Sequence, residues 1–293
     1  STKLSLDSGG FGISRFTLDN FLYQKALHEG VNVIVEQEVE SVFFLDDEDM
    51  FTVKTPRQEF SASLVIGAFG KRSRMDNTLK RGFIQKRSPY VGVKYHIRTN
   101  HPDNLIGLHN FNGGYCGISN IEDGKTNLCY LVQRKQVKRF KGIRDMEETV
   151  LFQNPFLKSI FHSADFLFDN PETINEISFE TKEPVLNHIL MAGDAAGMIA
   201  PLCGNGMAMA IHTGKIVSDL IVQAVAESRS RAWLEAAYAD RWTSTFAGRL
   251  RTGRLIQNYL FGSAWSSRVA VNLAVHSSWL AKQIIKKTHG LPF

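Results

Sequence analysis

Hydrophobic positions change their spacing several times along the first part of the chain, and each change marks a predicted element. Residues 17–28 carry apolar side chains at helical spacing, which predicts a helix ending at Gly30. Short apolar runs predict strands at 31–35, 39–45 and 51–53, the last after the acidic turn 46–49. The run 62–68 is apolar without alternation, which predicts a strand buried on both faces.

Longer alternating segments follow, and they predict a separate antiparallel sheet. The segments cover 91–97, 105–111, 115–120 and 126–132, with Gly, Asn and Asp turns between them. Helical spacing then covers 135–151 and 155–161. A strand at 189–192 leads into Gly193 and Asp194, and a helix rich in Ala and Met is predicted over 206–226. Helices dominate the remainder.

Composition narrows the class of protein. With 293 residues, 43% of them hydrophobic, the chain has enough apolar material for a large core in two lobes. The formal charge of +5 comes from Lys and Arg spread along the sequence, so we expect a small-molecule substrate, a mild preference for anionic ligands and no nucleic-acid partner. The oligomeric state is not predicted.

Cysteine usage and the apolar runs bear on the compartment. Cys116, Cys129 and Cys203 show no C-x-x-C spacing, so we expect no metal site and a reducing environment. No apolar run of about 18 residues occurs, and the first residues lack the apolar core of a signal peptide. We therefore expect a soluble, cytoplasmic protein.

The segment from Gly193 to Met207 carries the candidate chemistry. It reads Gly193-Asp194-Ala195-Ala196-Gly197, then Pro201, then Gly204-Asn205-Gly206 at the start of the long helix. Asp194 stands at the carboxyl end of a strand, where open α/β sheets bind ligands, and its carboxylate suits vicinal hydroxyls. Glycines at a helix start expose backbone N–H groups that favour negative charge, such as that of a reduced flavin. The alternative is an ordinary strand, loop and helix whose glycines only permit close packing.

This pattern resembles the second FAD-binding motif of the flavoprotein monooxygenase and geranylgeranyl reductase superfamily. The resemblance implies that Gly193 and Asp194 lie at the ribityl chain of FAD. It also implies that a loop lies beside the isoalloxazine ring, and this loop comprises Pro201, Gly204, Asn205, Gly206 and Met207.

Weaker similarities to the same superfamily precede that motif. Residues 12–16 with Asp19 look like the family's helix start, which implies that Arg15 lies near the cofactor; the alternative for Arg15 is a surface ion pair. Val39 falls where a strand of the family passes the adenine. Residues 64–73 are similar to V-x-G-A-D-G-x-x-S, with Phe69 in place of the Asp that many members use toward FAD and NAD(P)H.

The resemblance implies an α/β fold with a glutathione-reductase-type, Rossmann-like FAD-binding domain. No strand followed by G-x-G-x-x-G occurs in the chain, so we expect this domain to be incomplete. We predict its two parts at 1–80 and 186–227, an inserted antiparallel β-sheet substrate domain at 81–185, and C-terminal helices at 228–293.

The resemblance also implies an FAD-dependent oxidoreductase. Its flavin would be reduced by NAD(P)H and would act on a lipophilic or aromatic organic substrate, either as a reductase or as a monooxygenase. No catalytic side chain is predicted. The alternative function is a non-catalytic binding module that has lost tight FAD binding, which the lack of a G-x-G-x-x-G phosphate cradle motivates.

Apolar residues of the C-terminal stretch 255–287 have three interpretations. They contact a membrane surface peripherally, cap a lipophilic pocket, or pack as a helix on the body of the protein. The residues concerned are Leu260, Phe261, Trp265, Val269, Leu273, Trp279 and Leu280.

Overall fold

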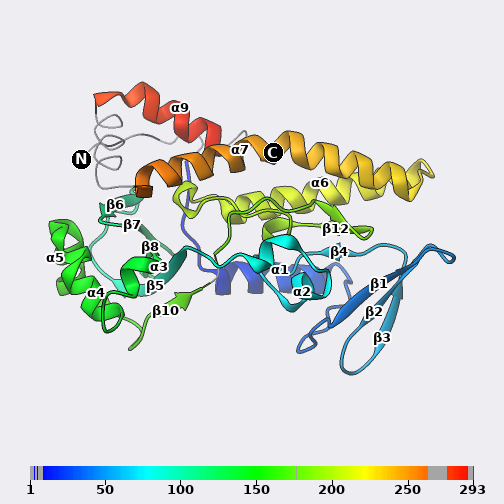
Figure 1. Cartoon of the computed structure of the whole chain (residues 1–293), viewed down its shortest axis with the longest axis horizontal. Coiled ribbons are helices and arrows are strands. Elements are labelled where there is room, and N and C mark those ends of the chain that lie inside the picture. Colours follow the sequence, from blue (N-terminus) through cyan, green and yellow to red (C-terminus); the bar gives the residue numbers. More distant parts are fainter. Residues whose placement is uncertain (1–2, 4, 6–8, 176, 263–275, 290–292) are drawn as a thin grey trace. The chain divides into compact units, whose positions relative to one another are not determined.

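The computed structural model describes the chain apart from residues 1–2, 4, 6–8, 176, 263–275 and 290–292 (Figure 1). The chain divides into two compact units. The first unit comprises Ser1–Val35, Ser88–Ile177 and Asn258–Ser278, and the second comprises Glu36–Arg87, Ser178–Gln257 and Trp279–Phe293. Residues 1–35, which we predicted to share a domain with 36–80, are thus grouped with the antiparallel sheet. The assignment of either unit to cofactor or substrate remains a prediction.

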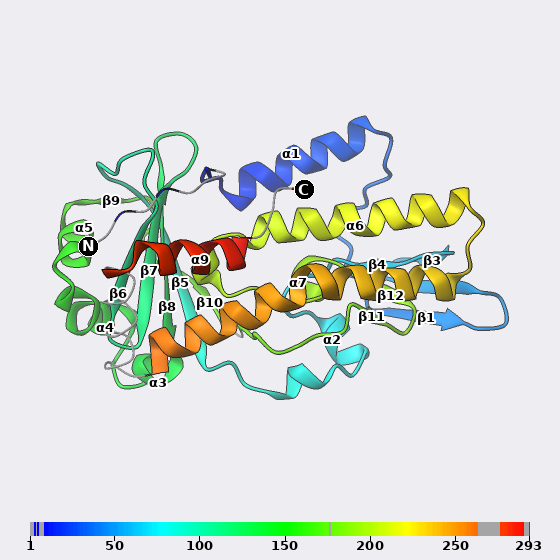
Figure 2. The same cartoon turned by 90° about the horizontal axis from the view of Figure 1, so that it is seen from above.

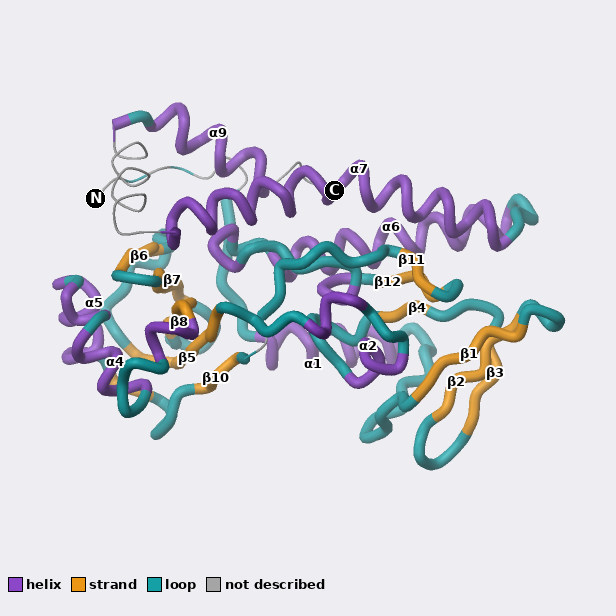
Figure 3. Tube along the Cα trace, viewed as in Figure 1, coloured by secondary structure: helices purple, strands orange, loops and turns teal. Residues whose placement is uncertain are grey.

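An antiparallel sheet forms the centre of the first unit, as predicted (Figure 3). Its strands run in the order β10-β5-β8-β7-β6, and β9 pairs with β5. Their bounds are Tyr90–Arg98 (β5), Gly107–Phe111 (β6), Gly114–Asn120 (β7), Thr126–Gln133 (β8), Asp165–Phe166 (β9) and Glu172–Ile174 (β10). The short strands β9 and β10 were not predicted.

Short helices pack on this sheet and close its core. They are α3 (Arg134–Val137), α4 (Ile143–Thr149) and α5 (Pro155–Ser163), with the 3-10 turn η2 (Leu151–Gln153). Met146, Leu151 and Leu157 are fully buried in the core. The predicted helix 135–151 is wrong as a single element, because Gly142 is extended and separates α3 from α4. The predicted helix 155–161 is confirmed as α5, which Asn154 caps.

The predicted helix after Gly12 is also confirmed, as α1 (Arg15–His28). Ser14 caps it, since its hydroxyl accepts a hydrogen bond from the Thr17 N–H at 3.1 Å. Glu122 then accepts hydrogen bonds from the Ser14 N–H and the Thr17 hydroxyl at 2.8 and 2.9 Å. A Cβ at Gly12 would collide with the Asn120 carbonyl, so glycine is needed there. No residue of α1 is buried.

The predicted strand 31–35 is wrong. These residues have no strand assignment, and Val31 and Val35 are 53% and 58% exposed. Within the described part of the chain no strand pairs with them. A strand needs a neighbour to satisfy its backbone groups, so β-branched residues alone do not produce one.

Two three-stranded sheets belong to the second unit. One is the antiparallel meander β1 (Ser41–Leu45), β2 (Met50–Lys54) and β3 (Glu59–Ala62). The other has the order β11-β12-β4, in which β12 (Ile189–Met191) pairs in parallel with β4 (Ile66–Gly67) and antiparallel with β11 (Val185–Leu186). The predicted strand 62–68 is reduced to β4. It is not buried on both faces, because Ile66 is 43% exposed.

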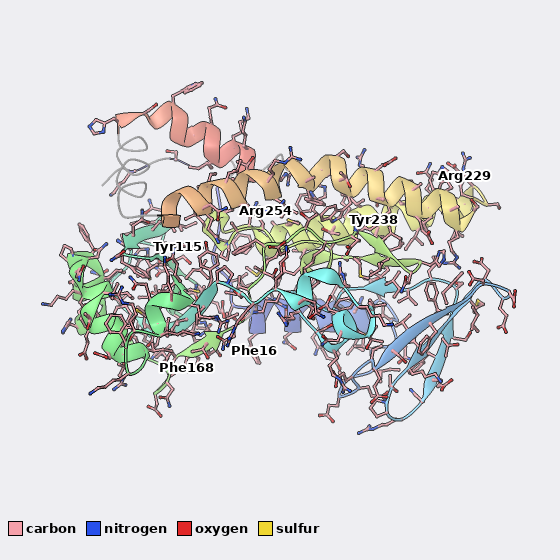
Figure 4. All side chains as sticks on the ribbon, viewed as in Figure 1. Phe16, Tyr115, Phe168, Arg229, Tyr238 and Arg254 are labelled. Atoms are coloured by element: carbon pink, nitrogen blue, oxygen red, sulfur yellow. The ribbon has the colours of Figure 1, made fainter. Side chains whose placement is uncertain are left out.

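Helices α6 (Gly206–Ala226) and α7 (Arg231–Gly262) are the longest of the described helices. Over their second-unit residues they run side by side (Figures 1 and 2). Residues from both helices form one core with all of β12, to which α7 contributes Tyr238, Trp242 and Phe246. Tyr238 extends from α7 (Figure 4) and donates a hydrogen bond to the Met191 carbonyl. The bounds of α6 are those predicted from the sequence.

The C-terminal stretch is described in part. Helix α9 (Ser278–His289) carries Trp279, which is 69% exposed. Three predicted contact residues, Trp265, Val269 and Leu273, lie outside the described residues, as do the side chains of Leu260, Phe261 and Leu280. None of the described helices combines the length and apolar content needed to cross a bilayer.

Candidate functional site

The candidate loop begins where β12 ends and the backbone turns sharply. Gly193 has φ of 58°, a left-handed conformation that favours glycine. A Cβ at this position would lie 3.3 Å from the Cβ of Ala210, so the turn lies directly against α6. Asp194 follows within the 3-10 turn η3 (Gly193–Ala195) and is half-buried. The structure therefore brings the Gly193-Asp194 turn next to α6.

The first turn of α6 leaves space at its N-terminus. The 3-10 turn η4 (Pro201–Cys203) ends at Gly204, whose φ is 67°, and the helix starts at Gly206. A Cβ added at Gly204 or Gly206 would meet no atom within 4 Å. No side chain caps the helix. Its first N–H groups have no partner within the helix, so this terminus can accept a negatively charged group.

Asn205 is the N-cap residue of α6, but its side chain serves another segment. Its Nδ2 donates to the main-chain carbonyl of Thr288 at 2.9 Å, which ties the loop to α9. Its Oδ1 is buried and has no hydrogen-bond partner among the described residues. A buried acceptor without a donor is costly, so this atom suits an N–H group of a ligand.

Two buried cations hold the backbone of the loop. The guanidinium of Arg81 donates to the carbonyl of Ala195 at 2.8 Å and pairs with the carboxylate of Asp76 at 3.1 Å. The ammonium of Lys182 donates to the carbonyls of Lys71 and Asp194, each at 2.7 Å. Burial lowers the pKa of Lys182 to about 8, and the charge of Asp76 opposes this shift.

Neither cation was predicted from the sequence. Arg81 lies 114 positions before its partner Ala195, and neither Arg81 nor Lys182 is part of a motif. One signal was present, since Ser73 and Asp76 have the spacing of a capping box, which the structure contains at the start of α2 (Arg74–Thr78). That box places the Asp76 carboxylate where Arg81 reaches it.

Cys203 lies in the candidate loop, where burial favours its protonated, less nucleophilic form. It is buried, and burial raises its pKa to about 11, although a hydrogen bond with Thr288 opposes the shift. A thiol with this pKa is protonated near neutral pH and is a poor nucleophile. The side chain acts as small apolar filler.

The remaining predicted residues are divided between the units. Arg15 belongs to the first unit, where its side chain forms an exposed ion pair with Asp19 at 2.8 Å. Val39 belongs to the second unit and packs, half-buried, on its core. The cofactor contacts implied for both residues stay predictions. Within the second unit, the Gly193-Asp194 turn and the loop from Pro201 to Met207 flank the same end of α6.

No protein-family model matches the chain. Curated proteins do match. A digeranylgeranylglycerophospholipid reductase of Methanosarcina acetivorans is 25% identical over 266 residues, which are 85% of this chain and 62% of the relative. The reductase of Methanosarcina mazei is 24% identical with the same coverage, and reductase 1 of Methanopyrus kandleri is 22% identical over 275 residues, 88% of this chain and 70% of that protein. The chain thus spans about 62% of the length of the first two relatives.

Solved structures share the fold. A flavin-dependent brominase has a TM-score of 0.71 at 18% identity, with 94% of this chain and 70% of that chain covered. A Klebsiella pneumoniae protein solved with FAD and uric acid has a TM-score of 0.69 at 14% identity. The match covers 94% of this chain and 70% of that chain. A Cytophaga hutchinsonii flavoprotein/dehydrogenase has a TM-score of 0.68 at 16% identity. This match covers 96% of this chain and 73% of that chain.

The fold is that of the FAD-binding flavoproteins, an α/β fold with an antiparallel sheet and C-terminal helices, as the sequence predicted. The particular resemblance is confirmed as well. The chain is similar in sequence to digeranylgeranylglycerophospholipid reductases and shares its fold with flavin-dependent halogenases. Both findings agree with the resemblance to the flavoprotein monooxygenase and geranylgeranyl reductase superfamily.

Proposed function

We propose that the chain functions as an FAD-dependent oxidoreductase and that the start of α6, with Asp194, binds the flavin end of the cofactor. The observation that carries the proposal is the uncapped N-terminus of α6, where Gly204 and Gly206 leave open space above the backbone. Such a terminus stabilises the negative charge of a reduced flavin. The relatives named as reductases support the same assignment.

Each residue of the loop has a role in this proposal. Asp194 accepts hydrogen bonds from ribityl hydroxyls, and the buried Oδ1 of Asn205 accepts from an N–H of the cofactor. Arg81 and Lys182 hold the carbonyls of residues 195 and 194, which fixes the loop before any ligand binds. FAD, when bound, supplies hydride transfer or the activation of dioxygen.

We further propose that the reaction is a reduction of an unsaturated, lipophilic substrate, with NAD(P)H as the source of electrons. The three curated relatives described above are named as digeranylgeranylglycerophospholipid reductases, which favours reduction over hydroxylation. The halogenases and the other solved flavoproteins support the fold alone. No side chain of the described residues is assigned a catalytic role.

A cofactor titration tests the site. The purified full chain is titrated with FAD, and binding is followed by the absorbance and fluorescence of the flavin. Asp194→Ala removes hydrogen bonds to a carboxylate and weakens binding by about 10- to 100-fold. Asp240→Ala, which removes an exposed carboxylate on α7, serves as the matched control and leaves the affinity unchanged. Circular dichroism confirms that both variants fold.

Two outcomes overturn the proposal. A folded wild-type chain that neither retains FAD nor binds added FAD supports the binding module instead. Equal affinities of wild type and Asp194→Ala for FAD place the cofactor elsewhere.

A second experiment tests the type of reaction. With flavin bound, oxygen consumption and reduction of a polyunsaturated isoprenoid lipid are measured side by side with NADH and NADPH. Oxygen incorporation into product without saturation of the lipid contradicts the reductase assignment.

A further inference from the structure

The segment 134–144 of the first unit concentrates positive charge. It reads Arg-Lys-Gln-Val-Lys-Arg-Phe-Lys-Gly-Ile-Arg, so six of its eleven residues are basic and none is acidic. Lys and Arg are otherwise spread along the chain, and this segment departs from that pattern. It comprises α3, the extended link through Gly142 and the start of α4.

Packing leaves most of these charged side chains exposed to solvent. The apolar residues of the segment recur every third position, at Val137, Phe140 and Ile143, and all three pack on the core of the first unit. The basic residues between them therefore point outward. Lys135, Lys138, Arg139, Lys141 and Arg144 are exposed, and together with Arg134 they form what we call the basic surface.

A groove lies at one end of the basic surface. Its volume is about 370 Å³, and it is lined by Pro89, Tyr90, Gln133, Arg134, Lys135 and Lys138. Two of its lining residues belong to the sheet, because Tyr90 and Gln133 are paired residues of β5 and β8. Arg134 adds two further links, from its backbone N–H to the Pro89 carbonyl at 2.7 Å and from its Nε to the Ser88 carbonyl at 2.9 Å.

Five of the six cations of the basic surface form no ion pair with another described residue. Among the described residues, no carboxylate pairs with the side chains of Lys135, Lys138, Arg139, Lys141 or Arg144. The neighbouring carboxylate of Asp145 accepts from the backbone N–H of Lys141 at 3.0 Å. Exposed Lys54 and Lys86, by contrast, each lie 2.7 Å from a glutamate oxygen. The basic surface therefore attracts anions from solution.

We propose that the basic surface docks the first unit on a phospholipid bilayer containing anionic lipids, with a lipid phosphate in the groove. Clustered Lys and Arg on a folded surface match the negative potential of such a bilayer. A nucleic acid is disfavoured, because Phe140 packs on the core and Tyr90, which lines the groove, is buried, so neither presents a ring face on which bases can stack. The docking needs no flavin, so it stands or falls independently of the proposed function.

Vesicle co-sedimentation tests the proposal with the full chain. Wild-type protein is expected to bind vesicles of phosphatidylcholine containing phosphatidylglycerol, to bind pure phosphatidylcholine weakly, and to lose binding as salt increases. The triple variant Lys135→Gln, Lys138→Gln, Lys141→Gln loses about fivefold in partitioning per residue, or about a hundredfold in all. These exposed substitutions leave the circular dichroism spectrum unchanged.

The matched control carries Lys25→Gln, Lys54→Gln and Lys86→Gln, which lower the net charge equally but remove lysines already paired with glutamates. It is expected to bind as wild type does. Equal loss in both triple variants, or equal binding to both kinds of vesicle, overturns the proposal. Displacement by inorganic phosphate, at ionic strength matched with chloride, assigns the groove to free phosphate instead. Binding to duplex RNA but not to vesicles overturns it as well.

Discussion

The ammonium nitrogen of Lys182 lies 2.7 Å from the main-chain carbonyl oxygen of Asp194. The same ammonium also lies over the ring of Phe83, 4.3 Å from its centroid. Lys182 is nearly fully buried, and this burial accounts for its pKa of about 8. One titratable side chain is therefore in direct contact with the backbone of the candidate loop, and its protonation is measurable through stability.

Stability around Lys182 depends on pH in a direction that follows from its lowered pKa. Between about 8 and 10.5 the unfolded chain binds more protons at this residue than the folded chain does, so its contribution to stability rises with pH. In urea unfolding, the free energy of unfolding of wild type minus that of Lys182→Met is expected to increase by up to about 3 kcal/mol over this pH window. Lys215→Met, at an exposed pair with Asp219, is the control. If this difference in free energy does not change with pH, the claim that burial lowers the pKa of Lys182 is contradicted.

The buried pair of Arg81 and Asp76 is expected to be sensitive to loss of one partner. Both side chains are completely inaccessible to solvent. Arg81→Met leaves the Asp76 carboxylate buried without its cation and lowers the free energy of unfolding by about 3–5 kcal/mol. Arg74→Met, which breaks an exposed pair with Glu38, costs about 0–1 kcal/mol. Similar losses in the two variants would mean that Arg81 is not buried as described.

Glu147 is the acceptor for two tyrosines in the core of the first unit. Its Oε1 lies 2.8 Å from the Tyr95 hydroxyl and 2.6 Å from the Tyr130 hydroxyl. Glu147→Ala leaves both hydroxyls buried without an acceptor and is expected to cost about 2–5 kcal/mol in thermal or urea unfolding. The adjacent exposed Glu148→Ala changes stability by less than about 0.5 kcal/mol. Glu147→Gln keeps an acceptor oxygen and restores part of the loss.

Two glycines near α6 are expected to respond to alanine in opposite directions. Gly193 has φ of 58°, so Gly193→Ala strains the backbone and costs about 1–2 kcal/mol. Gly214 lies within α6, and a Cβ there meets no atom within 4 Å. Gly214→Ala therefore raises stability by about 1 kcal/mol. Midpoints of urea unfolding measure both changes, and a gain in the Gly193 variant would exclude the left-handed turn.

Elements with a strong local pattern were predictable. Helix α6 has the predicted bounds because its apolar spacing continues for 21 residues from a Gly-x-Gly start. The antiparallel strands β5 to β8 were predicted because alternation and turn residues agree. Residues 31–35 show the limit of such patterns, since a strand also requires a partner that local sequence does not specify. The helix break at Gly142 was missed because the apolar spacing continues across it.

The candidate site likewise combines residues that a local motif predicts with residues that it does not. The turn at Gly193 and the open start of α6 follow from a contiguous motif, and the structure places them against each other. Arg81 and Lys182 reach the loop from other parts of the chain, and a lone Arg or Lys in a sequence gives no sign of burial. Cofactor contacts of Arg15 and Val39 rest on the resemblance and stay predictions.

Strand β4 gives the mixed sheet β11-β12-β4 of the second unit an open margin. Among the described residues it hydrogen-bonds to β12 and to no other strand, and Ile66 is exposed there. A free margin of this kind is a template on which another extended segment can add. Because β4 is only two residues long, this margin offers few backbone groups to another chain, and a charged residue at position 66 would weaken any such pairing without touching the candidate loop.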